Sequence, residues 1–168
     1  ELGCGLGNDT FFFSQNGYFV LATDFSDEAI KHNQQRYSNN PNLEFKVSNM
    51  SEVFPQNNDE FDVVYARLSL HYFSDLITKK IFKEIYRVLK SNGLLCFMCK
   101  STSDPLYGKG EKIEDDMYIY KGHIRHFFSV NYIKEILGSN FKIERMKSGI
   151  ENLYGDKSAF VKVVARKI

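Results

Sequence analysis

Short apolar runs and amphipathic segments alternate along this chain. Runs rich in β-branched and aromatic residues predict strands at residues 18–23, 43–48, 61–68, 94–99, 141–148 and 159–167. Segments with apolar positions every three or four residues predict helices at residues 8–16, 26–37, 76–90 and 129–139. The clearest is the third helix, in which Ile77, Ile81, Ile85 and Leu89 recur between charged residues.

Strands that alternate with helices predict an α/β fold with a doubly wound, mostly parallel sheet. The last two strands follow each other closely and predict an antiparallel hairpin that closes the sheet. Residues 100–127 are polar and predict a long loop, and loops of this length are usually either functional lids or disordered segments. In such sheets ligands bind at the carboxyl ends of the strands, so the residues that follow each strand are the candidates for a site.

Composition and charge favour a globular domain and disfavour a nucleic-acid-binding or membrane-spanning protein. The chain has 168 residues, 43% hydrophobic and 26% charged, which predicts one globular domain over residues 1–168. The formal net charge of +1 provides no basic field for nucleic acid. No apolar run reaches the roughly 20 residues of a membrane-spanning helix. Three cysteines without disulfide-type spacing favour a reducing, cytoplasmic location.

Two groups of residues have the chemistry of metal ligands, but their arrangement argues against a metal site. Cys96 and Cys99 lie in a predicted strand, where residues three apart point to opposite faces, so we expect free thiols. The adjacent acids of residues 111–116 fit a solvated loop.

A glycine cluster opens the chain. In "ELGCGLG", Gly3, Gly5 and Gly7 precede a predicted helix, where glycines let the backbone turn sharply and approach a ligand. Asp24 ends the next predicted strand, and a carboxylate there can accept both hydroxyls of a ribose. Ser26 serves as the cap of the following helix, which leaves the Asp24 carboxylate for a ligand.

Four motifs in order carry a family resemblance: "ELGCGLG", "ATDFS", "FDVVYARLSLHYF" and "IYRVLKSNGLLCF". Together they resemble the class I S-adenosylmethionine-dependent methyltransferases. The segment "GKGEKIEDDMY…GHIRHFFS" is more loosely similar to the tellurite-resistance and thiopurine-methyltransferase-like group. The resemblance implies a Rossmann-like, seven-stranded sheet and S-adenosylmethionine as cofactor, with S-adenosylhomocysteine as product. It also implies that the N-terminal helix and most of the first strand are missing from this sequence.

The resemblance also implies roles for individual residues. It assigns to the cofactor Glu1, Gly3, Cys4, Gly5, Asp24, Phe25, Asn49, Met50, Arg67 and Leu68. Asn49 stands where relatives carry an Asp that reads the adenine amino group. Arg67 stands where relatives carry a small or apolar residue, and because it would repel a sulfonium we expect it to point away or to hold a carboxylate.

Candidates for the acceptor side follow the fourth predicted strand and the polar stretch. His71 and Tyr72 are the catalytic candidates, able to orient an acceptor or take a proton. Arg125 and His126 are the substrate candidates, because an Arg can clamp an anionic or planar molecule.

The sequence leaves several functions open. A small-molecule methyl acceptor fits best, since no recognition domain is appended. A protein or RNA acceptor remains an alternative, as does a non-catalytic relative that only binds the cofactor, which Asn49 and Arg67 motivate. A nicotinamide oxidoreductase would carry GxGxxG rather than the GxGxG found here. The oligomeric state does not follow from the sequence.

Overall fold

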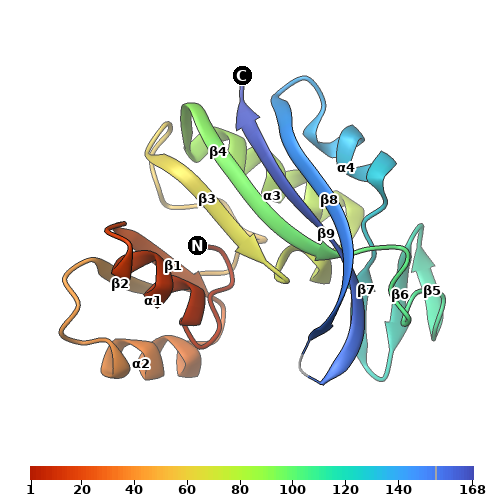
Figure 1. Cartoon of the computed structure of the whole chain (residues 1–168), viewed down its shortest axis with the longest axis horizontal. Helices are drawn as coiled ribbons and strands as arrows, with labels where there is room; N and C mark the ends of the chain where they lie inside the picture. Colours follow the sequence, from red (N-terminus) through yellow and green to blue (C-terminus); the bar gives the residue numbers. More distant parts are fainter. Residues whose placement is uncertain (154) are drawn as a thin grey trace.

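The computed structural model describes residues 1–153 and 155–168 and consists of a twisted sheet with helices against it (Figure 1). The helices are α1 (Asn8–Gln15), α2 (Asp27–Arg36), α3 (Asp75–Val88) and α4 (Val130–Leu137), with the short 3-10 helix η1 (Leu70–Tyr72). The strands are β1 (Val20–Asp24), β2 (Leu43–Val47), β3 (Phe61–Arg67), β4 (Leu89–Lys100), β5 (Glu111–Glu114), β6 (Met117–Tyr120), β7 (His123–His126), β8 (Phe141–Leu153) and β9 (Asp156–Lys167).

Serine caps set the start of three helices. The hydroxyls of Ser26, Ser74 and Ser129 each accept the backbone N–H of the third residue of the helix that follows, α2, α3 and α4 respectively. Such a cap satisfies a donor that has no partner inside the helix, and its loss costs about 1 kcal/mol. The predicted caps at Ser26 and Ser129 are confirmed.

The sheet is mixed and falls into two hydrogen-bonded parts. β1 pairs with β2 in parallel, and a four-stranded part has the order β3-β4-β9-β8, in which only β3 and β4 run parallel. Leu2 bridges Thr23 of β1 and donates its N–H to the Tyr65 carbonyl of β3 (2.9 Å), so the glycine-rich segment lies between the two parts. The predicted α/β fold and antiparallel hairpin are confirmed. The predicted seven-stranded, mostly parallel sheet is corrected in two ways. The sheet is mixed because β9 runs antiparallel to both β4 and β8. It falls into two parts because the segment at Leu2 makes only an isolated bridge to β1.

The main core lies between α3, α4 and the four-stranded part. Ile81 and Ile85 of α3 are fully buried with Leu95 and Phe97 of β4. Burial of each such side chain stabilises the fold by about 1.5–3 kcal/mol. A smaller cluster of Cys4, Ala22, Ile30 and Phe45 fixes α2 and the glycine segment against β1 and β2.

The polar stretch of residues 100–127 is not a plain loop, and that prediction was wrong. It contains an antiparallel sheet of β5, β6 and β7, drawn at the right of Figure 1. Turns with positive φ at Asp116 (55°), Lys121 (51°) and Gly122 (76°) connect its strands. All four side chains of β5 are exposed, so no apolar alternation marks this strand in the sequence.

Strand lengths also differ from the prediction. β4 begins at Leu89, directly after α3, so it includes residues that the sequence predicted to end the helix. Its pairing with β3 shifts register between Phe61 and Val63. β8 and β9 extend into their expected connection, where residue 154 lies outside the described residues. Within the described chain, no helix is both long enough and apolar enough to cross a membrane.

Candidate active site

The turn that leads from Glu1 to α1 contains three glycines, and two of them have a further reason to be glycine besides their backbone conformation. Gly3, Gly5 and Gly7 all have positive φ (72°, 51° and 71°), a conformation that side chains disfavour. At Gly3 a Cβ atom would overlap the Ser69 side chain, so the glycine permits close packing. At Gly5 an added Cβ would meet nothing within 4 Å, because this residue borders a cavity.

Two side chains hold the backbone of Gly5 in place. Its N–H donates to Asp24 Oδ2 (2.8 Å), and its carbonyl accepts from Asn33 Nδ2 (2.7 Å). Asn33 is completely buried in α2. Asn33 was not among the residues predicted from the sequence. The signal that could have revealed it is its spacing: it lies three positions after Ile30, on the inward face of the helix.

Asp24 lies at the carboxyl end of β1 and is 8% exposed. Its second oxygen, Oδ1, accepts the Ser26 backbone N–H (2.9 Å). Each carboxylate oxygen can accept two hydrogen bonds, and each receives one here. The carboxylate is therefore anchored by the protein and can still accept two hydroxyl groups.

Two adjoining cavities open at the carboxyl ends of β1, β3 and β4. The glycine-turn cavity has a volume of about 960 Å³, and the Phe25 cavity has a volume of about 900 Å³. Gly3, Leu68 and Tyr72 line both, so the two spaces are neighbours. The ten residues assigned to the cofactor from the sequence all line one or both: Glu1, Gly3, Cys4, Gly5, Arg67 and Leu68 the first, and Gly3, Asp24, Phe25, Asn49, Met50 and Leu68 the second.

The Phe25 cavity combines apolar surface with a polar turn. Phe25 is 81% exposed and contributes a free ring face beside Met50. The Asn49 side-chain oxygen accepts from both the N–H and the hydroxyl of Ser51 (3.1 and 2.8 Å), while its amide group donates to Glu52. Asn49 thus stabilises its own turn, and its oxygen already has two donors.

In the glycine-turn cavity, Arg67 at the end of β3 lies 3.6 Å from Asp9, which provides the carboxylate contact expected from the sequence. Burial raises the pKa of the Glu1 carboxyl, and a hydrogen bond from the Thr10 hydroxyl opposes this change. Burial likewise raises the pKa of the Cys4 thiol to about 12, so this thiol is neutral.

His71, Tyr72 and Arg125 form one wall of the same cavity. The rings of His71 and Tyr72 are 4.5 Å apart, and the Arg125 guanidinium lies 4.6 Å from the centre of the Tyr72 ring. His71 is 1% exposed, and its Nδ1 has no hydrogen-bond partner within the described residues. Burial, helped by the charges of Arg125 and Lys100, lowers the pKa of His71 to about 3. His71 is therefore a neutral imidazole at ordinary pH.

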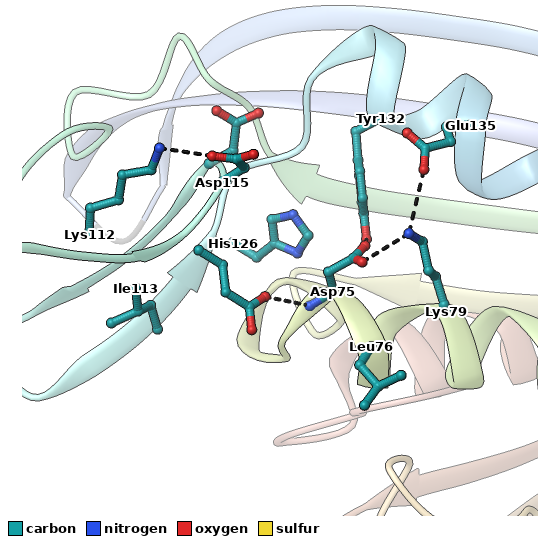
Figure 2. A pocket seen from close by; sticks show the side chains of 11 residues that line it. Asp75, Leu76, Lys79, Lys112, Ile113, Asp115, His126, Tyr132 and Glu135 are labelled. Carbon is teal, nitrogen blue, oxygen red and sulfur yellow. Dashed lines mark hydrogen bonds and ion pairs between the residues drawn. The ribbon is translucent and has the colours of Figure 1, made fainter.

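His126 does not line the same cavity as Arg125, the other residue predicted for the substrate. The two residues are neighbours in β7, and successive side chains of a strand point to opposite faces. His126 packs between Phe128 and Tyr132, at ring distances of 4.9 and 4.6 Å. It faces a separate cleft between α3 and β5 of about 760 Å³, shown in Figure 2.

Acidic and basic side chains in the cleft between α3 and β5 are paired with each other (Figure 2). Glu114 of β5 accepts the Asp75 backbone N–H at the start of α3 (2.9 Å), and Lys79 lies 2.9 Å from Asp75 and 3.4 Å from Glu135. The first contact attaches the three-stranded sheet to α3, and the Lys79–Glu135 pair attaches α3 to α4. Among the described residues, no group of His, Cys, Asp and Glu side chains is arranged to hold a metal ion.

A family model described as a methyltransferase domain matches residues 1–97, the part of the chain that contains the glycine turn, Asp24 and the end of β3. The chain belongs to this methyltransferase-domain family. It is 30% identical over 135 residues to phosphoethanolamine N-methyltransferase 1 of Caenorhabditis elegans, covering 79% of this chain and 28% of that protein. It is 25% identical over 138 residues to the malonyl-[acyl-carrier protein] O-methyltransferase of Hamiltonella defensa, covering 81% and 49%.

Solved structures agree on the fold. An S-adenosylmethionine-dependent methyltransferase of Methanosarcina mazei matches with a TM-score of 0.87 at 22% identity, covering 99% of this chain and 90% of that chain. The chain spans less than half the length of the two curated relatives named above. The prediction of a class I S-adenosylmethionine-dependent methyltransferase fold is confirmed, and S-adenosylmethionine is the family's cofactor.

The residues present fit this cofactor. Asp24 retains two acceptor positions for the hydroxyls of a ribose, and Phe25 offers an aromatic face for a base. Gly5 leaves open the space that a side chain would fill. Two adjoining cavities provide room for a nucleoside in one and for the methionine part and an acceptor in the other.

Proposed function

We propose that the protein transfers a methyl group from S-adenosylmethionine to a small-molecule acceptor. The observation that carries the proposal is the junction of the two cavities at Gly3, Leu68 and Tyr72. A nucleoside in the Phe25 cavity would extend toward the glycine-turn cavity, where an acceptor has room beside it. The name of one relative, a phosphoethanolamine N-methyltransferase, supports a small acceptor. The name of another, a malonyl-[acyl-carrier protein] O-methyltransferase, supports a small acyl group carried on a protein as the alternative.

The cofactor would be held mainly by Asp24, Phe25 and the glycine turn. Asp24 would accept the ribose hydroxyls, Phe25 would lie beside the adenine, and Glu1 and Gly5 would border the methionine part. When bound, S-adenosylmethionine supplies a methyl group on a positively charged sulfur for in-line displacement. Arg67 lies near this position, and its pairing with Asp9 reduces the repulsion that its charge would otherwise exert.

On the acceptor side, His71 and Tyr72 would position the attacking group. A histidine with a pKa near 3 is a poor general base at neutral pH, because the proton-transfer driving force is small. His71 would therefore act as a neutral hydrogen-bonding group. Alignment of a nucleophile by such contacts can lower a barrier by up to about 7–11 kcal/mol.

Calorimetric titration with S-adenosylmethionine, S-adenosylhomocysteine and NADH tests the cofactor part of the proposal. We expect binding of the two adenosyl compounds and none of NADH. Formation of S-adenosylhomocysteine in the presence of phosphoethanolamine, ethanolamine and a panel of carboxylic acids then tests transfer. If neither adenosyl compound binds, the proposal is wrong.

A second candidate is a protein that binds the cofactor without transferring its methyl group. The arrangement of Asn49 favours it, because the Asn49 oxygen already accepts from Ser51 and offers little to an adenine amino group. This candidate predicts binding of S-adenosylhomocysteine with no product from any acceptor. Asn49→Asp distinguishes the two candidates: a gain in affinity that brings measurable turnover supports a weakened enzyme.

A further inference from the structure

Basic side chains are concentrated in the glycine-turn cavity. Its lining includes five cationic side chains, those of Arg67, Lys100, Lys109, Arg125 and Lys157. The same lining has two carboxylates, Glu1 and Asp9. Because the whole chain has a formal net charge of only +1, this excess is local to the cavity.

Two of the five cations are already neutralised. Arg67 pairs with Asp9 at 3.6 Å. Lys100 lies 2.9 Å from Asp104, whose side chain is completely buried, and also donates to the Ser158 hydroxyl (3.1 Å). These contacts hold the end of β4, the following loop and β9 together, so the charge of Lys100 serves the fold.

The other three cations, Lys109, Arg125 and Lys157, make no ion pair with any residue that the structure describes. They come from the loop after β4, from β7 and from β9, and they converge on one cavity although they are far apart in the sequence. Unpaired like charges repel each other, and an anion placed among them would remove this repulsion.

Arg125 is the cation of this group whose side chain is held in place by its neighbours. Its guanidinium lies 4.6 Å from the centre of the Tyr72 ring, and its Nη1 donates to the Ile124 carbonyl (3.0 Å). Its Nε is enclosed and has no acceptor in the described part of the chain. A buried donor without a partner is costly, and an oxyanion that binds the Nε edge of a guanidinium in two-pronged geometry removes this cost.

The rest of the lining is compatible with a small molecule that has one charged end. Leu6, Leu68, Pro105 and Leu106 contribute apolar surface to the same cavity. The buried Nδ1 of His71 lies in the wall that Arg125 shares with Tyr72 and also has no partner among the described residues. We propose that the methyl acceptor carries an oxyanion, a phosphate or a carboxylate, that binds Arg125, Lys109 and Lys157. This inference rests on the proposed function, because it names the acceptor class of the same site.

Binding of small anions to the protein saturated with S-adenosylhomocysteine tests the inference. With that compound bound, its own carboxylate has already taken its partners, so the cationic side chains that remain report on the acceptor. Inorganic phosphate and malonate are titrated separately by calorimetry. Binding of phosphate alone supports a phosphorylated acceptor, and binding of malonate alone supports a carboxylated one; binding of both supports the shared oxyanion site.

Two variants locate the anion. Arg125→Lys keeps the charge but loses the two-pronged geometry, and a double variant, Lys109→Gln with Lys157→Gln, removes two exposed charges without touching the core. We expect each to weaken anion binding about tenfold, as for the loss of a charge-assisted contact of about 1.4 kcal/mol. Lys112→Gln is the matched control, because Lys112 pairs with Asp115 outside this cavity. It should leave anion binding unchanged.

Four results would overturn the inference. The first is binding of S-adenosylhomocysteine without binding of either anion, which leaves the proposed function intact. The second is competition between phosphate and S-adenosylhomocysteine, which would assign the basic side chains to the cofactor. The third is equal weakening by Lys112→Gln, which would indicate a general surface effect. The fourth is failure of S-adenosylhomocysteine itself to bind, which would remove the proposed function together with this inference.

Discussion

Gly5→Ala separates the two reasons for a glycine in the turn, the backbone conformation and the space beside it. Gly5 has a φ of 51°, and its missing side chain would enter the glycine-turn cavity without touching any atom within 4 Å. Gly17 also has positive φ (85°) and an equally open Cβ position, but it borders neither cavity. Gly17→Ala is therefore a matched control for backbone strain.

The two variants should cost similar stability and differ in binding. Placing a Cβ in the left-handed region costs about 1–2 kcal/mol, so both should unfold at lower urea concentration. A methyl group added to the wall of an occupied site costs about 1–3 kcal/mol by overpacking. At 1.4 kcal/mol for each factor of ten, Gly5→Ala should bind S-adenosylhomocysteine about 5- to 150-fold more weakly than the Gly17→Ala control.

Urea denaturation and calorimetric titration on the same preparations provide the two readouts. If Gly5→Ala binds S-adenosylhomocysteine as tightly as Gly17→Ala, the cofactor does not pass this glycine, and the assignment of the cavity is wrong. If Gly5→Ala alone unfolds, Asn33→Ala provides a second test at the same turn, because it removes the donor to the Gly5 carbonyl without adding a charge.

Three further predictions concern single side chains. Asp24→Asn should weaken binding of S-adenosylmethionine at least tenfold, whereas the exposed Asp27→Asn should not, as measured by calorimetry. His71→Gln should flatten the pH dependence of stability: because the pKa of His71 is lowered to about 3, the unfolded chain takes up the proton first, and stability falls by up to about 1.4 kcal/mol per pH unit as pH decreases from 6.5. Urea unfolding at several pH values measures this slope, and an unchanged slope would contradict it. Asp104→Asn should lower the free energy of unfolding by about 3 kcal/mol, because Lys100 would lose a buried partner; a loss below 1 kcal/mol would show that the pair is dispensable.

The residues of the proposed cofactor side could be picked out from the sequence because their signals are local. Gly3 and Gly5 lie in a glycine cluster before a helix, and Asp24 ends a short apolar run. The topology of a parallel sheet brings such positions to one edge. Asn33 escaped notice because nearly every residue of α2 is polar, so one buried Asn does not stand out from its exposed neighbours. The strand β5 escaped because all of its side chains are exposed, so its pairing with β6 leaves no apolar pattern.

The acceptor side is harder to predict because it is built from side chains that meet only in the folded chain. Lys109 precedes β5, Arg125 lies in β7 and Lys157 lies in β9, and no spacing in the sequence relates them. The position of Arg125 depends on the register of β6 with β7, and a shift of one residue would turn His126 into the cavity in its place. In the proposed function, the glycine turn, Asp24 and Phe25 would hold the cofactor, whereas the register of a small sheet and the position of one hairpin would select the acceptor. Substitutions in residues 100–127 should therefore change which acceptor is bound while leaving S-adenosylmethionine binding intact.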